Sequence, residues 1–250
     1  MITIKSAKQI EYMRHAGRIV FETHKRLEQA IKPGVTTKEL DTIARKYILS
    51  QGATPSFKGY NGFPASICAS VNEQVVHGIP SLKPLKDGDI ISIDIGVNCK
   101  GYHGDAARTN PVGTISDKAN RLIRITRESF YEGIKYAVEG NRLSDISAAI
   151  QQYAEKHSYS VVRDLVGHGI GSQMHEEPQI PNYGKPGRGP RLRAGMTLAI
   201  EPMINMGKYH VKVLPDQWTV VTTDGSLSAH YEHTVLITHN EPELLTQVIE

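Results

Sequence analysis

The chain has 250 residues, of which 39% are hydrophobic and 22% charged, so it is long enough to bury a sizeable core. Its formal net charge of +3 is too small to indicate a nucleic-acid partner by itself, and we expect no DNA binding. Two cysteines, Cys68 and Cys99, form no CxxC motif, which argues against a disulfide framework or a cysteine-type zinc site. No segment resembles a leader or reaches the length of a membrane span, so we expect a cytoplasmic protein without a membrane partner.

Two helices are predicted at the start of the chain. Ser6 is a suitable N-cap for a first helix, whose apolar residues recur at helical spacing through about Ile31. Thr36 or Thr37 caps a second helix that ends at Gly52. The pattern then becomes β-rich, with short strands predicted at 57–60 and 65–71 and a hairpin turn at 61–62 between them.

A β-hairpin is predicted over residues 90–110. Apolar residues alternate with Ser92, Asp94 and Gly96, and the chain reverses at Lys100-Gly101. Asp105 then arrives on the returning strand, where it can converge with Asp94. Two close carboxylates repel each other, and a divalent cation would remove that repulsion. Taken alone, the stretch is better explained by a polar hairpin with two solvated aspartates.

The order of elements then repeats. Helices are predicted from Ser116 to about Ile134 and from Leu143 to about Tyr153, with strands after them. Gly140 corresponds to Gly34 at an offset of 106 residues. The repetition predicts two structurally similar halves, approximately 1–112 and 113–250, within one domain spanning 1–250.

The second half contains acidic residues inside apolar strands, as the first half does. Strands are predicted at 161–165, 196–204 and 230–237, and the last two contain Glu201 and Glu232. Acidic residues are rare in strands unless they are paired or bound to metal. With His168, which lies between two glycines, the four carboxylates form a hard, oxygen-rich donor set. Such a set can hold two divalent ions, an arrangement that hydrolases use to activate water and polarise a carbonyl.

Over nearly its whole length the sequence resembles the type I methionine aminopeptidases of bacteria, which have the pita-bread fold. The resemblance is carried by eight motifs: SFKGYNGFPASIC at 56–68, NEQVVHGIP at 72–80, SIDIG at 92–96, GYHGD at 101–105, GHGIG at 167–171, HEEP at 175–178, AIEPM at 199–203 and HYEHT at 230–234. It implies an α+β fold with two pseudo-symmetric halves, an antiparallel sheet lined by helices and a dinuclear metal site at the centre.

The resemblance also implies roles for individual residues. The family's metal ligands fall on Asp94, Asp105, His168, Glu201 and Glu232. Asp94 would chelate one ion, Asp105 and Glu232 would bridge both, and His168 and Glu201 would hold the other. Catalysis would involve His77, His175 and Glu201: His175 donates to the carbonyl oxygen and the developing oxyanion, and His77 contacts the substrate. Other histidines, including His15, His24 and His157, are expected at the surface.

A pocket for a methionine side chain is implied next to these residues. It would be formed by Tyr60, Phe63, Cys68, Met174 and Trp218, together with His77 and His175. An apolar pocket with a sulfur neighbour suits a thioether, although these residues also fit an ordinary core. The chain departs from the family at Met174, where a Phe is usual, and at Gly96, where many members have Thr. Both departures affect pocket shape and metal preference and leave the ligands intact.

The expected activity is removal of the N-terminal methionine from nascent proteins and peptides whose second residue is small and uncharged, by attack of a metal-bridging hydroxide. Two divalent ions per chain (Co, Mn, Fe or Zn) and a monomer are expected. A basic loop at 181–193, with Lys185, Arg188, Arg191 and Arg193, suggests transient contact with the ribosome, against the simpler reading of a solvated loop.

Alternative functions are weaker on the same evidence. A proline-specific aminopeptidase would share the fold, but those relatives usually carry an extra N-terminal domain. A non-catalytic binding homologue would be favoured by loss of ligands, and all five are present. Gly167–Gly171 is not a GxGxxG motif, and the chain has neither HExxH nor a GxSxG elbow.

Overall fold

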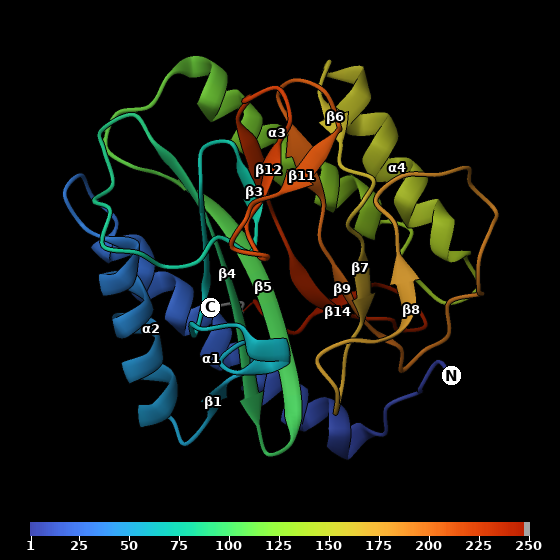
Figure 1. The fold of residues 1–250 in the computed structure, drawn as a ribbon. Helices are drawn as coiled ribbons and strands as arrows, with labels where there is room; N and C mark the ends of the chain where they lie inside the picture. Colours follow the sequence, from blue (N-terminus) through green and yellow to red (C-terminus); the bar gives the residue numbers. More distant parts are fainter. Residues whose placement is uncertain (248–250) are drawn as a thin grey trace.

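Two long antiparallel strands, β4 and β5, run through the middle of the computed structural model, which describes residues 1–247 (Figure 1). The helices in this part of the chain are α1 (Ala7–Ala30), α2 (Thr37–Ser50), the 3-10 helix η1 (Tyr60–Gly62), α3 (Asp117–Ile134) and α4 (Leu143–Lys156). The strands are β1 (Thr54–Pro55), β2 (Cys68–Val71), β3 (Gln74–Val76), β4 (Ile90–Cys99), β5 (Tyr102–Pro111), β6 (Ser160–Val161), β7 (Gly167–Gly169), β8 (Glu176–Ile180), β9 (Thr197–Ile200), β10 (Met203–Asn205), β11 (Val211–Val213), β12 (Val220–Thr222), β13 (Ser228–His230), β14 (His233–Leu236) and β15 (Glu243–Leu244).

The first two helices form where their caps predict them. The Ser6 side chain accepts a hydrogen bond from the backbone of Gln9, and the Gln9 side chain accepts from the backbone of Ser6. Thr36 and Glu39 make the same reciprocal pair at the start of α2. Each capping box satisfies two backbone N–H groups that have no partner within the helix, which fixes where the helix begins.

The predicted repeat of two halves is visible in the helices and hairpins. Helices α2 and α4 have 14 residues each and begin and end at an offset of 106, the offset that the sequence predicts. Each half then continues into antiparallel strands, β4 and β5 in the first and β9 and β14 in the second. The two halves therefore deliver their strands to the middle of the molecule in the same order.

Four sheets make up the β structure of residues 1–247, and every pair of named strands in them is antiparallel. One contains β1, β4, β2 and β5, and the largest has the order β15-β14-β9-β7-β8. The two smaller sheets have the orders β13-β10-β6 and β11-β12-β3. The α+β class and the antiparallel arrangement predicted from the sequence are confirmed.

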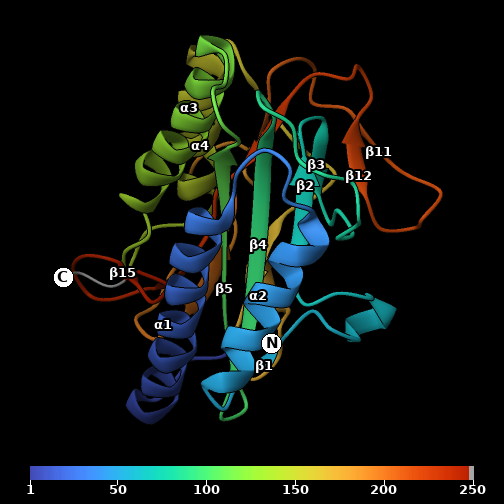
Figure 2. The same cartoon turned by 90° about the vertical axis from the view of Figure 1, so that its left-hand side faces the viewer.

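The helices and the long strands form two layers. Figure 2 shows α1, α3 and α4 on one side of β4 and β5, with β2, β3, β11 and β12 on the other. The first half buries an apolar core between α1 and α2 and the β4–β5 hairpin, and the second packs α3 and α4 on β9 and β14. Asp94 and Asp105 of the long strands are left on the face away from this helical core.

The predicted hairpin at 90–110 is confirmed. Its turn residues Lys100 and Gly101 have φ values of 54° and 81°. Two successive positive φ values belong to the tight turns whose twist matches that of paired strands, and glycine adopts them at little cost. The turn sets the register of β4 against β5.

The predicted strand at 57–60 and the hairpin turn at 61–62 are wrong. Gly59, Asn61 and Gly62 have φ values of 84°, 48° and 88°, and these left-handed conformations cannot continue a strand. The segment instead curls into η1. The following strand begins only at Cys68 and pairs with β4 rather than with the preceding segment.

Three further strands are shorter than predicted. The strand expected at 161–165 is limited to β6, after which Val162 enters an apolar cluster. The strands expected at 196–204 and 230–237 are each interrupted, after Ile200 and after His230. Pro202 has no N–H for a ladder hydrogen bond, which accounts for the first break.

Two other findings complete the fold. His24, expected at the surface, is buried in α1, and its Nε2 lies 2.9 Å from the carbonyl oxygen of Ala106. Among residues 1–247, no helix is long and apolar enough to span a lipid bilayer.

Candidate metal centre

Asp94 and Asp105 lie on the same face of the β4–β5 hairpin. Asp94 pairs with Ala107, and Gly96 pairs with Asp105. The two carboxylates are therefore diagonal neighbours, offset by two residues along the strands. Side chains directly opposite in an antiparallel pair point to the same face, and diagonal neighbours are within reach. The convergence predicted from the alternation of the sequence is therefore observed.

Glu201 and Glu232 lie where the strands of the second half are interrupted. His233 pairs with Ile200, and Met203 pairs with His230. The same register holds on both sides of the break, which places Glu201 opposite Glu232. The interruption frees their side chains from the sheet while keeping the two residues adjacent.

The two halves are joined along β5 by hydrogen bonds next to these acids. The N–H of Glu232 donates to the carbonyl oxygen of Ala107 at 2.9 Å. The Thr234 hydroxyl accepts from the N–H of Asp105 and donates to its carbonyl oxygen, both at 2.9 Å. Asp105 from the first half and Glu232 from the second are thereby held together.

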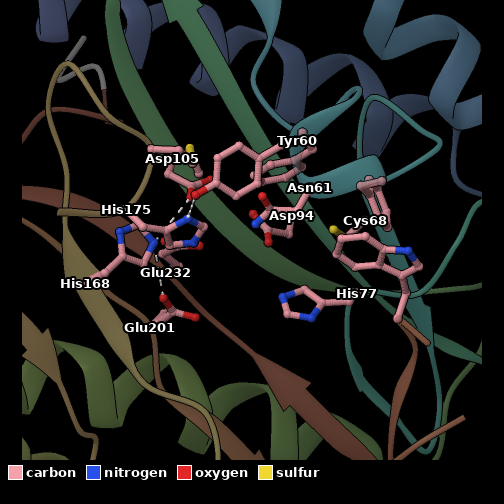
Figure 3. Close-up of a pocket in the computed structure, with 14 residues that line it drawn as sticks. Tyr60, Asn61, Cys68, His77, Asp94, Asp105, His168, His175, Glu201 and Glu232 are labelled. Carbon is pink, nitrogen blue, oxygen red and sulfur yellow. Dashed lines mark hydrogen bonds and ion pairs between the residues drawn. The ribbon is translucent and has the colours of Figure 1, made fainter.

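All five residues predicted as metal ligands line one cavity (Figure 3). One ligand atom from each of Asp105, His168 and Glu232 lies within 4.8 Å of the others. His168 Nε2 is 3.9 Å from Asp105 Oδ2 and 3.7 Å from Glu201 Oε1. Asp105, His168 and Glu232 are only 2%, 7% and 1% exposed.

Several oxygens of this cluster are buried without a protein partner. Asp94 Oδ1, Asp105 Oδ1 and Glu232 Oε1 accept no hydrogen bond. Burial raises the pKa of Asp105 to about 7, and burial together with repulsion from neighbouring acids raises those of Asp94, Glu201 and Glu232. Without a cation, ionising these buried carboxylates is costly. A divalent cation would coordinate the unpartnered oxygens and offset their negative charge, so the cluster fits bound divalent cations.

The hydrogen bonding and protonation state of His168 suit it to bind a metal ion. Its Nδ1 lies 2.8 Å from the carbonyl oxygen of Gly169, a bond that requires the proton on Nδ1. Nε2 is then left with its lone pair toward Asp105 and Glu201. Burial, followed by the neighbouring His175, lowers the pKa of His168 to about 3, so the ring is neutral as metal binding requires.

Two further histidines face the cavity. The His175 ring lies beside that of His168, tilted by 58° with ring centroids 4.2 Å apart, and its Nδ1 is 2.7 Å from the hydroxyl of Tyr60. His77 occupies the opposite side in Figure 3 and has a φ of 59°, unusual for a residue other than glycine. Burial, followed by the neighbouring His175, lowers the pKa of His77 to about 4. Both rings are neutral at neutral pH and can exchange hydrogen bonds with a substrate.

The predicted methionine-pocket residues line the same cavity, whose volume is about 210 Å³. Phe63 and Trp218 meet edge to face with ring centroids 5.1 Å apart. Cys68 pairs with Asp94 across β2 and β4, which sets its sulfur beside the carboxylate cluster. Tyr60, Phe63, Cys68, Met174 and Trp218 all contribute to the lining, so the pocket adjoins the acids directly.

Three residues of the site are not predicted by the sequence pattern. Phe57 and Asn61 line the cavity because the 56–63 segment curls over it, which periodicity does not reveal. His230 is 1% exposed, and its Nε2, which accepts or donates no hydrogen bond, is 3.6 Å from Glu201 Oε2. The sequence pattern places His230 on the same strand face as Glu232, and this could have indicated that His230 belongs to the site.

Comparison with known proteins identifies relatives of the chain. Residues 11–239 match the profile of metallopeptidase family M24. A methionine aminopeptidase of Clostridium perfringens is 60% identical over 99% of this chain and 100% of its own length. Methionine aminopeptidase 1 of Bacillus subtilis is 58% identical with the same coverage.

Solved structures agree with these relatives. The crystal structure of methionine aminopeptidase from Rickettsia prowazekii is 46% identical, covers 99% of this chain and 100% of that chain, and has a TM-score of 0.98. A prolidase from Pyrococcus furiosus, 23% identical with a TM-score of 0.77, covers 99% of this chain and 66% of that chain and shares the fold alone. The pita-bread fold predicted from the sequence motifs is confirmed.

Proposed function

The chain belongs to metallopeptidase family M24, and we propose that it removes the N-terminal methionine of peptides using two divalent ions held by five side chains. Asp94 would hold one ion, His168 and Glu201 the other, and Asp105 and Glu232 both. The observation that supports this assignment is the set of buried carboxylate oxygens without protein partners at one point. The ions, when bound, would supply an activated water and polarise the scissile carbonyl.

His175 is assigned the stabilisation of the carbonyl oxygen. Its Nδ1 is 2.7 Å from the Tyr60 hydroxyl, and a phenol that donates there leaves the imidazole proton on Nε2. A neutral N–H fixed in this way can donate to the oxygen as negative charge develops on it. Tyr60 then selects the tautomer of His175 in addition to lining the pocket.

His77 and Glu201 complete the catalytic assignment. His77 lies on the wall of the cavity facing His175 and is placed to contact the substrate near the scissile bond. Glu201 has one carboxylate oxygen 3.7 Å from His168 Nε2 and the other 3.6 Å from His230 Nε2. We assign to Glu201 the transient holding of a proton in addition to its role as a ligand.

The apolar part of the cavity would receive the methionine side chain. Phe63, Trp218, Met174 and Cys68 present ring edges and sulfur atoms, which are favourable contacts for a thioether. A small second residue would be required, since a bulky one would displace the bond from His175. Comparable rates for Met-Gly-Ser and Met-Phe-Ser peptides would refute this size rule.

Metal identity and number can be tested together. Metal-free protein would be assayed on a Met-Ala-Ser peptide as Co²⁺, Mn²⁺, Fe²⁺ or Zn²⁺ is added back in increasing amounts. We expect no cleavage without metal and a maximum near two ions per chain. Activity of protein verified to be free of metal would contradict the proposed function.

We further propose that residues 1–250 form one catalytic domain that acts as a monomer in the cytoplasm. Both halves supply ligands, so neither would be active alone. Lys185, Arg188, Arg191 and Arg193 are exposed, which agrees with a transient ribosome contact through the 181–193 loop. Salt-dependent ribosome binding that survives charge reversal at all four positions would count against that contact.

A further inference from the structure

A second cavity lies on the helix side of the molecule and shares no lining residue with the first. It has a volume of about 360 Å³, within the range of small-molecule sites, whereas the metal cavity has about 210 Å³. Phe21 and Glu28 of α1 form one side, and Ile123 and Arg127 of α3 form another. Arg108 of β5 also lines it.

The alternation of side chains explains why this cavity lies back to back with the metal centre. Asp105 and Arg108 are three residues apart on β5, so they point to opposite faces. Glu232 enters the metal cavity, while Tyr231 and His233 on either side of it line the second one. Tyr231 and His233 therefore face away from the metal centre.

The cavity carries more positive than negative charge. Arg108 reaches one carboxylate, with Nη1 3.1 Å from Glu28 Oε1, while its buried Nε has no hydrogen-bond partner. Arg127 lies over the Tyr131 ring, 5.7 Å from its centroid, and within residues 1–247 it makes no ion pair with a carboxylate. Glu28 therefore compensates the charge of only one of the two guanidinium groups.

Arg108 and Arg127 line the cavity together with the phenols of Tyr131 and Tyr231. The Tyr231 hydroxyl is 3.3 Å from that of Tyr131, a long contact, and 3.1 Å from His233 Nε2. Two cations and two hydroxyl groups therefore gather around one region, with Phe21 and Ile123 as apolar walls.

We propose that this cavity is a binding site for a small organic anion whose carboxylate or phosphate head contacts Arg108 and Arg127. Guanidinium groups bind both oxyanions through paired, charge-assisted hydrogen bonds, and the unpartnered Nε of Arg108 is a ready donor. The apolar body of the ligand would pack against Phe21 and Ile123. The site is independent of the peptide substrate and of the metal ligands.

Calorimetric titration of the metal-loaded protein with phenyl phosphate, benzoate and inorganic phosphate tests the proposal. We expect saturable binding of at least one organic probe at one site per chain, tighter than that of inorganic phosphate. Phenyl phosphate and benzoate distinguish a phosphate head from a carboxylate head. Absence of saturable binding by all three at millimolar concentration would overturn the proposal.

Matched variants locate the binding. Arg127→Gln and Arg108→Gln should each weaken it at least tenfold, because each removes a charge-assisted contact. Arg124→Gln is the control, since Arg124 is on the same helix but bonds Glu128 and does not line the cavity. Unchanged affinity in Arg127→Gln, an exposed position whose replacement should not impair folding, would show that the anion binds elsewhere, including at the metals, and would refute the site.

Discussion

The hydroxyl of Tyr60 lies 2.7 Å from Nδ1 of His175, and the two rings are 5.2 Å apart between centroids. The two residues are 115 positions apart in the sequence and come from different halves of the chain. The contact joins the curled 56–63 segment to the histidine proposed to stabilise the carbonyl oxygen. It gives Tyr60 a chemical role that a residue of an apolar pocket would not have.

Tyr60→Phe should keep the pocket and lose the orientation of His175. We expect kcat to fall by up to about tenfold, the scale of one net hydrogen bond, with a smaller change in KM. Steady-state kinetics on a Met-Ala-Ser peptide would measure the two separately. Tyr136→Phe, at an exposed tyrosine remote from the cavity, is the control. A change confined to KM would mean that Tyr60 only lines the pocket.

His175→Ala should separate catalysis from metal binding. Turnover should fall by roughly a hundredfold or more, the scale of removing one donor to a developing oxyanion, while metal content stays near normal. Elemental analysis and turnover measured on the same sample give the comparison. If metal content falls in step with turnover, His175 is a ligand and its assigned role is wrong.

Local sequence pattern predicts much of this fold. The capping boxes at Ser6 and Thr36 and the Lys100-Gly101 turn are short-range features, and the structure has them where the sequence places them. The same holds for the convergence of Asp94 and Asp105, which follows from the period of two in a strand. These features depend on residues that are close in the sequence, so a single sequence is enough to predict them.

The remainder depends on contacts between distant segments. No periodicity reveals that Glu232 bonds Ala107, or that Phe57 packs beside Gly96, because both contacts form only when distant segments come together. Strand breaks at Glu201 and Glu232 were missed because apolar alternation continues across them. Acidic residues inside apolar strands already predict the metal-binding set, whereas the roles of the individual ligands and the pocket residues came only from the eight motifs.

Gly96→Thr should be destabilising because Phe57 occupies the space that a side chain needs. A Cβ at position 96 would lie 2.7 Å from Phe57 Cε1 and 2.9 Å from Ser56 Cβ. Overpacking of this kind costs about 1–3 kcal/mol. In a Phe57→Ala background the same substitution should cost less, as measured by urea unfolding of the metal-loaded proteins. Equal costs in the two backgrounds would show that Phe57 is not the obstacle.

The buried acids predict a pH-dependent difference between metal-free wild type and Asp105→Asn. Burial raises the pKa of Asp105 from 3.8 to about 7 in the folded state. Its folded pKa exceeds its unfolded pKa, so its contribution to stability is complete below about pH 4 and is lost as pH rises toward 7. Asparagine is neutral at every pH, so the Asp105→Asn variant has no corresponding loss of stability.

The stability of Asp105→Asn relative to wild type should therefore increase as pH rises through this window, with both proteins free of metal. Taking the difference cancels the titration of the buried histidines, which acts on both proteins. Urea unfolding at several pH values would measure it. A difference that stays constant with pH, or that shrinks as pH rises, would contradict the unfavourable burial of the Asp105 charge.

Asp105 and Glu232 are proposed to hold a pair of divalent ions jointly. Equilibrium dialysis against Mn²⁺ or Co²⁺ followed by elemental analysis measures ions bound per chain in wild type, Asp105→Ala, Glu232→Ala and the exposed control Glu11→Gln. We predict two ions for wild type and Glu11→Gln, and a loss of both ions together with peptide cleavage in the other two variants. Wild-type stoichiometry and activity in Asp105→Ala or Glu232→Ala would contradict this joint role.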